Sequence, residues 1–185
     1  YWRPSPAGSA NTDNVVLWLK GGDFCESYSD CVARQLKPGL GSSKAWPKTY
    51  YGNGIQSPDK AENPDFFDWN HVYLEYCSGD LWAGAQVEPV NPWPGSGPTN
   101  FTFAGHLFLA QVIDHLEKVT HGRKPKEFIL TGGSAGGIGV FVNADWLGAQ
   151  LPASTKYRAM PQGGFFGHAY ADWAHFKANI SDPDP

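Results

Sequence analysis

Ser134 is the residue whose setting most clearly predicts chemistry. It lies in the Gly-rich stretch 132–137, after an apolar segment at 128–131 and before a segment at 138–150 that is typical of a helix. A Gly-x-Ser-x-Gly pattern between a strand and a helix is typical of a nucleophile elbow, a turn too tight for side chains that lifts the serine hydroxyl above the end of a sheet. The pattern therefore predicts that Ser134 is the nucleophile of a serine hydrolase.

Other Gly-rich turns also join strands to helices. A phosphate-binding loop would end in Gly-Lys-Ser or Gly-Lys-Thr, and a dinucleotide-binding loop would need Gly-x-Gly-x-x-Gly and a later acidic residue, neither of which fits here. A turn that serves only packing stays open as an alternative. A second turn favours catalysis, because Gly21-Gly22-Asp23 directly follows the apolar run 15–19. An α/β-hydrolase supplies one N–H group of its oxyanion hole from such a place, although a plain strand-ending turn would have the same composition.

The order of apolar segments predicts an α/β fold in one domain covering 1–185. Strands that alternate with helices imply a parallel sheet with right-handed crossovers, and we expect helices on both of its faces. Predicted strands lie at 15–19, 71–76, 128–131 and 157–160, and predicted helices at about 102–121 and 138–150. The stretches 23–70 and 79–98 are rich in glycine and proline and are predicted to be loops. The expected architecture is an α/β-hydrolase-like sheet that is incomplete in this chain.

Composition argues against several classes of function. The 185 residues carry a formal net charge of −4 without a basic cluster, so we expect no nucleic-acid partner. No apolar run reaches the roughly 18 residues of a membrane span, and the chain opens without a signal peptide, as expected if it has been removed or the N-terminus is missing. No ligand spacing indicates zinc, so no metal or cofactor is predicted, and a monomer is expected. The histidines predicted to be structural are His71, His106, His115 and His121.

Cysteines and sequons favour a secreted protein. Cys25 and Cys31 are six positions apart, a spacing that a disulfide could close, whereas Cys77 has no evident partner. Three buried free thiols are the alternative. Asn100 and Asn179 each begin an Asn-x-Ser/Thr sequon in polar surroundings and are candidate glycosylation sites. Together these features predict an extracellular protein.

The chain resembles the pectinacetylesterase and Notum family of carboxylesterases. The resemblance runs from about residue 17 to residue 164 and rests on six short segments that occur in the family's order. They are Leu-Lys-Gly-Gly-Asp-Phe-Cys at 19–25, Gly-Ser-Ser at 41–43, Gly-Ile-Gln-Ser at 54–57, Asn-Pro-Asp-Phe-Phe-Asp-Trp-Asn at 63–70, Tyr-Cys-Ser-Gly-Asp at 76–80 and Gly-Ser-Ala-Gly-Gly at 133–137. Six ordered matches are far more specific than one elbow.

The resemblance implies a secreted, metal-independent serine esterase that removes acyl groups from a glycan or a lipidated protein. Ser134 matches the family's nucleophile, and the backbone N–H groups of Gly22, Asp23 and Ala135 would form the oxyanion hole. Our leading prediction is the release of acetyl groups from a polysaccharide such as pectin. Two alternatives stay open: a Notum-like esterase that removes palmitoleate from a protein, and a non-catalytic relative that binds a glycan or a lipid.

The sequence departs from the family pattern at two points. The family usually has an aromatic residue after the Gly-Gly pair, where this chain has Asp23, whose charge would oppose an oxyanion if it pointed inward. The family's acid and histidine lie far downstream of the serine, whereas 51 residues follow Ser134 here. His168, Asp172 and His175 form the only compact group in that stretch and are more typical of a solvated surface. We therefore expect the base and the acid beyond residue 185, and no activity in this chain alone.

Overall fold

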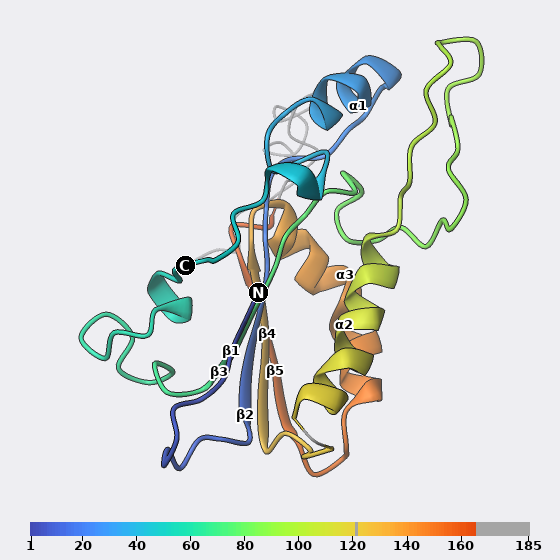
Figure 1. The fold of residues 1–185 in the computed structure, drawn as a ribbon. Coiled ribbons are helices and arrows are strands. Elements are labelled where there is room, and N and C mark those ends of the chain that lie inside the picture. Colours follow the sequence, from blue (N-terminus) through green and yellow to red (C-terminus); the bar gives the residue numbers. More distant parts are fainter. Residues whose placement is uncertain (121, 166–185) are drawn as a thin grey trace, which may run out of the picture.

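The computed structural model describes residues 1–120 and 122–165, which build one five-stranded sheet (Figure 1). The strand order is β1-β3-β2-β4-β5; β1 runs antiparallel to β3, and the other neighbours are parallel. The strands are β1 (Trp2–Arg3), β2 (Asn14–Leu19), β3 (Asn70–Leu74), β4 (Glu127–Gly133) and β5 (Lys156–Gln162). The helices are α1 (Tyr28–Gln35), α2 (Gly105–Val119) and α3 (Ala135–Gln150), with short 3₁₀ helices η1 (Ser43–Ala45) and η2 (Gly54–Gln56).

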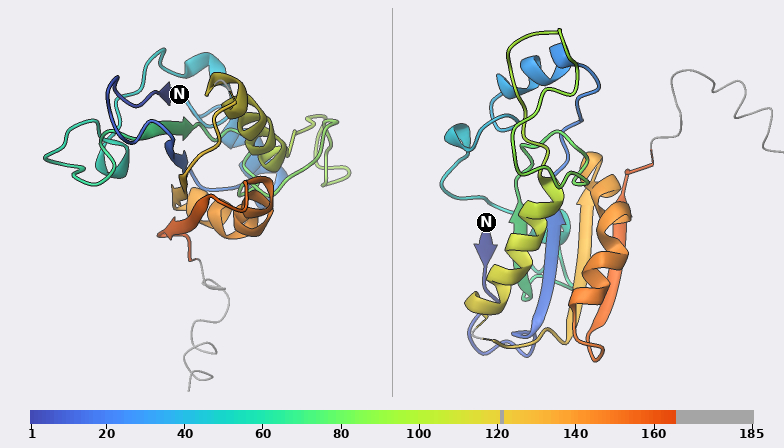
Figure 2. Two further views of the ribbon diagram at one scale, coloured as in Figure 1. Left: turned by 90° about the horizontal axis from the view of Figure 1, so that it is seen from below. Right: turned by 90° about the vertical axis from the view of Figure 1, so that its right-hand side faces the viewer.

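The direction of each crossover decides which face of the sheet it covers. The connections from β3 through α2 to β4, and from β4 through α3 to β5, advance across the sheet in the same direction. Because crossovers between parallel strands are right-handed, α2 and α3 lie on one face, as Figures 1 and 2 show. The connection from β2 to β3 advances the opposite way, and its segment 53–69 lies on the other face.

Both faces of β2 are buried, and this makes it the centre of the core. Val15, Leu17 and Leu19 belong to the cluster that includes the buried residues of α2 and α3. Val16 lies on the opposite face, where it packs with Trp69 from the β2–β3 connection. A strand that is covered on both sides has an uninterrupted apolar sequence instead of an alternating one, which is the pattern at 15–19.

Most of this sheet agrees with the sequence-based prediction. The α/β-hydrolase-like parallel sheet is confirmed, and the four predicted strands correspond to β2, β3, β4 and β5. Two differences concern the helices: α2 begins at Gly105 instead of Thr102, and the face opposite α2 and α3 carries only the short η2 in the described residues. The elements β1 and α1 were not predicted, because β1 has two residues and α1 is short and mostly polar.

His71 on β3 is a buried histidine of the kind expected to be structural. Its Nε2 atom lies 2.6 Å from the carbonyl oxygen of Phe66, and the residue is only 3% exposed. Burial lowers the pKa of His71 from its ordinary value to about 4, because the charged imidazolium would lose its hydration. The ring is therefore neutral in the folded protein at neutral pH.

This pKa predicts an acid-sensitive stability. An unfolded histidine has a pKa of about 6.5, so the unfolded state takes up the proton first and the free energy of unfolding falls as the pH drops from about 6.5 to about 4, by up to about 3 kcal/mol. The variant His71→Asn should lose this part of the pH dependence, measured by urea denaturation at several pH values. The matched change at the exposed His115 should keep the wild-type slope. Equal slopes for wild type and His71→Asn would contradict the assignment.

Candidate active site

Ser134 occupies the turn between β4 and α3 in a conformation that few residues adopt. Its backbone angles are φ 57° and ψ −124°, and it is the N-cap residue of α3. Its N–H group donates a hydrogen bond of 3.0 Å to the carbonyl oxygen of Gln162 at the end of β5. A serine at positive φ is strained and persists only where its surroundings hold it, a situation that is concentrated at functional sites. The geometry is that of a nucleophile elbow.

Two glycines explain how the elbow fits against the turn after β2. A Cβ atom on Gly136 would lie 2.0 Å from the carbonyl oxygen of Leu19, so α3 can meet β2 here only without a side chain. A Cβ atom on Gly21 would lie 2.4 Å from the carbonyl oxygen of Gly133 and 2.9 Å from Cβ of Ser134. The two Gly-rich motifs of the sequence therefore pack backbone against backbone, and each fixes the position of the other.

The elbow opens into a cavity at the carboxyl ends of the parallel strands. The cavity has a volume of about 460 Å³, and its wall includes the nucleophile candidate and both glycines of the turn after β2. Ligands of open α/β sheets bind at this edge. The lining residues are Trp18, Lys20, Gly21, Gly22, Tyr50, Asn53, Gln56, Tyr73, Gly133 and Ser134. The sequence predicted Ser134 and Gly22 in this list; Gln56 appeared there only within the family segment 54–57, and Tyr50, Asn53 and Tyr73 were not singled out.

The predicted oxyanion donors lie on both sides of this contact. Ala135 is the first residue of α3 and is buried, so its N–H group has no acceptor within the helix. Gly22 lines the cavity. Asp23 follows with φ 64°, and its exposed carboxylate accepts a hydrogen bond of 3.0 Å from the N–H group of Phe24. That carboxylate therefore caps its own turn at the surface, and Asp23 is not among the residues that line the cavity.

Arg34 holds the turn after β2 from the outside, a role that no signal in the sequence revealed. The residue is buried on α1; its Nη1 atom donates to the carbonyl oxygen of Gly22, and its guanidinium carbon lies 4.7 Å from the centre of the Tyr76 ring. The predicted disulfide between Cys25 and Cys31 is present, and it ties the start of α1 to the same turn. The helix that the sequence missed is thus a support of the candidate oxyanion loop.

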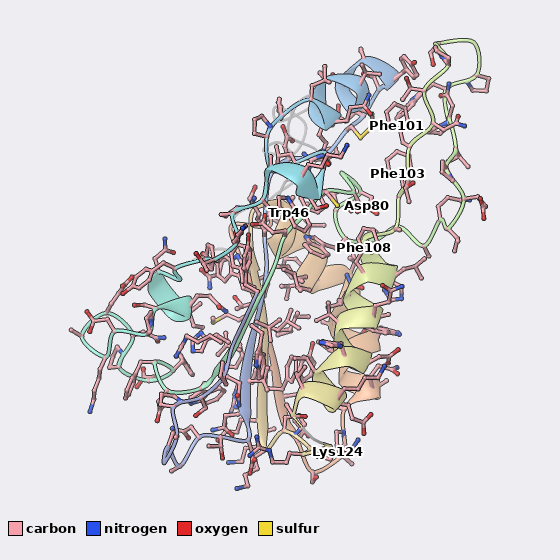
Figure 3. The ribbon with its side chains drawn as sticks, in the orientation of Figure 1. Trp46, Asp80, Phe101, Phe103, Phe108 and Lys124 are labelled. Carbon is pink, nitrogen blue, oxygen red and sulfur yellow. A yellow bond between two sulfur atoms is a disulfide. The ribbon has the colours of Figure 1, made fainter. Side chains whose placement is uncertain are left out.

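Trp82 also holds the turn after β2. Its indole Nε1–H donates a hydrogen bond of 3.1 Å to the carbonyl oxygen of Lys20, and the ring packs against α3 at Gly139. The carboxylate of Asp80 fixes the loop that carries Trp82, because it accepts from the N–H groups of Trp82 at 3.1 Å and of Gly105 at 2.7 Å. Asp80 therefore joins this loop to the start of α2. Figure 3 labels Asp80 close to Phe108 of that helix.

Comparison with known proteins assigns the chain to a family. The model of the pectinacetylesterase family matches residues 2–177. The chain belongs to the pectinacetylesterase family. It is 35% identical to the palmitoleoyl-protein carboxylesterase NOTUM of Schmidtea mediterranea over 95% of its own length and 31% of that protein, and 33% identical to pectin acetylesterase 5 of Arabidopsis thaliana over 85% and 35%. The chain thus spans about a third of the length of these relatives.

A solved structure supports the same assignment. The Wnt deacylase Notum from Drosophila superimposes with a TM-score of 0.74 at 34% sequence identity, over 87% of this chain and 46% of that one. Pectinacetylesterases and Notum enzymes therefore both lie at similar distances from this chain, and family membership leaves the acyl group and its carrier to be inferred from the site.

The described part of this member of the family contains no complete triad. In residues 1–120 and 122–165 no hydrogen bond joins a histidine to Ser134, and no group of three His, Cys, Asp or Glu residues could hold a metal. His106 instead pairs with Asn143 at 2.7 Å. No helix in this described part is long and apolar enough to cross a membrane. Several residues with a predicted role lie outside the described residues. They are His121, predicted to be structural, the group His168, Asp172 and His175, and the sequon at Asn179.

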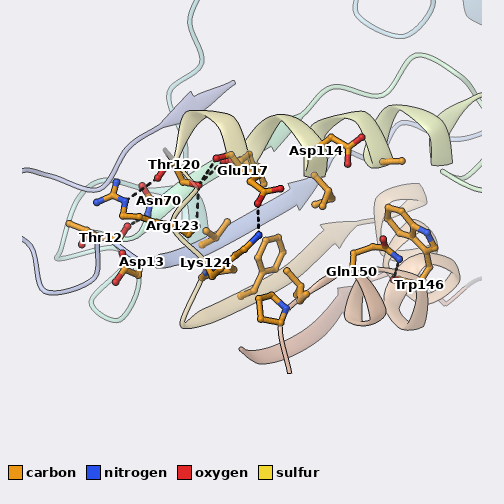
Figure 4. Close-up of a pocket in the computed structure, with 18 residues that line it drawn as sticks. Thr12, Asp13, Asn70, Asp114, Glu117, Thr120, Arg123, Lys124, Trp146 and Gln150 are labelled. Atoms are coloured by element: carbon orange, nitrogen blue, oxygen red, sulfur yellow. Dashed lines mark hydrogen bonds and ion pairs between the residues drawn. The ribbon is translucent and has the colours of Figure 1, made fainter. Parts of the chain in front are cut away.

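Two further features lie away from the elbow. Cys77 is a free, partly buried thiol that lines a cavity of about 210 Å³ together with the two cysteines of the disulfide. Burial raises the pKa of the Cys77 thiol above its ordinary value. A separate cavity of about 280 Å³ lies between α2 and α3 at the opposite end of the strands, with Phe128 and Trp146 in its wall and an ion pair of Glu117 and Lys124 at its rim (Figure 4). Its position at the amino ends of β2 and β4 separates it from Ser134.

Arg34 yields a prediction about the mobility of the turn after β2. Replacing Arg34 with Met removes a charged donor to the Gly22 carbonyl, and such a hydrogen bond corresponds to about a tenfold or larger change in an opening equilibrium. Amide hydrogens of residues 21–24 should therefore exchange about tenfold faster in Arg34→Met, measured by mass spectrometry on the full-length protein. The control Arg158→Met changes an exposed arginine of β5 and should leave this segment as in wild type. Unchanged exchange in Arg34→Met would refute the supporting role.

Proposed function

We propose that the full-length protein is a secreted serine carboxylesterase in which Ser134 is the nucleophile. One observation carries the proposal: Ser134 stands at φ 57° in the β4–α3 turn and faces the same cavity as the Gly-rich turn after β2. A packing turn would need glycines but no strained serine directed at a cavity. The disulfide and the exposed sequon at Asn100 support secretion and glycosylation.

In the proposed reaction the Ser134 hydroxyl oxygen attacks the carbonyl carbon of an ester. The carbonyl oxygen becomes an oxyanion, which the N–H groups of Ala135, Gly22 and Asp23 and the amino end of α3 would stabilise. The bond between the carbonyl carbon and the alcohol oxygen then breaks, the alcohol takes up the proton from the serine, and an acyl-enzyme remains. Water attacks the acyl-enzyme, releases the carboxylic acid and restores Ser134.

The proton transfers require a base and an acid that orients it. No described histidine forms a hydrogen bond with Ser134, and the chain covers only 31% and 35% of the two relatives compared. We therefore place the base and the acid outside the described residues. The carbonyl of Gln162 accepts from Ser134, so the chain that leaves β5 starts beside the nucleophile.

For the substrate we favour an acetyl ester of a polysaccharide such as pectin. The cavity at Ser134 combines Lys20, Asn53 and Gln56 with the rings of Tyr50 and Tyr73, a mixture suited to a sugar. A Notum-like activity on palmitoleoylated protein is the second candidate, and the 35% identity to planarian NOTUM over nearly the whole chain favours it. We propose that the enzyme acts as a monomer without a cofactor.

The nucleophile is tested by covalent labelling. A fluorophosphonate probe should react with the full-length protein at Ser134, and Ser134→Ala should abolish labelling and lower kcat on 4-nitrophenyl acetate by at least about 10⁴-fold. The control Ser154→Ala, at an exposed serine, should label as wild type does. A wild-type protein that neither labels nor hydrolyses the ester would instead be the non-catalytic binding relative.

The two substrate candidates are separated by acyl-chain length. Each methylene that a pocket buries adds about 0.8 kcal/mol, so an enzyme with a palmitoleate pocket should strongly prefer octanoyl to acetyl esters. We expect the acetyl ester of 4-nitrophenol to have the higher kcat/KM in the full-length protein. A preference for the octanoyl ester by tenfold or more would favour the Notum-like function instead.

A further inference from the structure

Gln56 lines the cavity of Ser134, and its buried side-chain nitrogen has no partner among the described residues. Gln56 is 5% exposed, and its Nε2 atom makes no hydrogen bond within the residues that the structure describes. Buried amides are almost always paired, because the loss of water from an unpaired amide destabilises the folded state. An unpaired amide in a residue that lines a cavity beside a candidate nucleophile points to a ligand that completes it. Because the Nε2 atom has almost no accessible surface, a ligand reaches it only when the amide turns about its last side-chain bond.

The structure holds Gln56 in this position firmly. The amide nitrogen of Asn63 donates hydrogen bonds of 3.0 Å to the carbonyl oxygens of both flanking residues, Ile55 and Ser57. Ile55 also packs on the core of this face, beside Val16. The backbone N–H of Gln56 itself donates 2.9 Å to the carbonyl oxygen of residue 53. The 3₁₀ turn η2 is thus fixed on both sides, and the unpaired amide is not the result of a loose loop.

The neighbours of Gln56 indicate the chemistry of that ligand. The rings of Tyr50 and Tyr73 stack at 3.9 Å between centroids, and both line the cavity, as does Asn53. Amide groups donate and accept hydrogen bonds, as sugar hydroxyls do, and aromatic rings pack against the apolar faces of sugars. An alkyl chain in the same place would leave the amide of Gln56 unpaired and would be disfavoured.

We propose that Gln56 is a specificity-determining residue that binds a hydroxyl group of the sugar carrying the ester. The cavity of about 460 Å³ then holds the alcohol side of the substrate, while the acyl group lies elsewhere. This inference rests on the proposed esterase function and adds to it the residue that selects a carbohydrate ester. Gln56 acts on binding of the leaving group and takes no part in the proton transfers.

The test compares two acetyl esters that differ only in their alcohol: acetylated pectin and 4-nitrophenyl acetate. In the full-length enzyme, Gln56→Leu should lower kcat/KM for acetylated pectin about tenfold, the loss expected for a hydrogen bond to a neutral hydroxyl, and leave 4-nitrophenyl acetate within about twofold. The thermal midpoint should stay the same or rise, because the change removes an unpaired buried amide. The control Gln150→Leu, at the far end of α3, should leave both esters unchanged.

The outcomes separate the inference from the function on which it rests. A parallel loss on both esters with a lower thermal midpoint would make Gln56 a structural residue and overturn the inference. Equal kcat/KM values for wild type and Gln56→Leu on acetylated pectin would also overturn it. Absence of Ser134 labelling and of ester hydrolysis in wild type would instead refute the esterase function itself.

Discussion

The structure depends on the direct contact of two backbone turns, one after β2 and one after β4. The Leu19 carbonyl and Gly136 meet without a side chain between them, and Gly21 meets the elbow at Gly133 and Ser134. This contact requires that β2 and β4 be neighbours and that α3 start at once after the serine. Trp82 and Arg34 then hold the turn after β2 through its carbonyl oxygens, which leaves the N–H groups of that turn free for other acceptors.

The sequence reveals the parts of this site that depend on residues adjacent in the chain. It does not reveal the parts that depend on contacts between distant segments. The elbow, the buried strands and the disulfide follow from local patterns, because a tight turn needs glycine and a strand covered on both faces needs an apolar run. Arg34 and Gln56 act through contacts that depend on the path of the long β2–β3 connection. That connection has no regular period, so the sequence showed a loop where the structure has the short helices α1 and η2. The strand order likewise explains the faces: the two long helices belong to crossovers that advance in one direction and share one face, whereas the β2–β3 connection advances the opposite way and lies on the other.

Asp23 occupies a position beside the candidate oxyanion hole where the family usually has an aromatic residue. Its position beside the candidate oxyanion hole raised the expectation of a harmful charge. In the structure the residue adopts φ 64°, a conformation that aspartate tolerates better than most side chains, and its carboxylate accepts from the next N–H group at the surface. The backbone conformation that brings its N–H group into the turn thus also turns its side chain toward water.

The open edge of β5 has a consequence for how the sheet can grow. The strand at the other edge is the short antiparallel β1, which has only two residues, whereas β5 has seven, most of them exposed, and no described strand pairs with its outer side. Unpaired strand edges attract further strands, and natural proteins cover them. Gln162, whose carbonyl binds the N–H of Ser134, stands at the carboxyl end of this edge strand. A strand that pairs with the outer edge of β5 would therefore lie on the side of the sheet from which its side chains can reach Ser134.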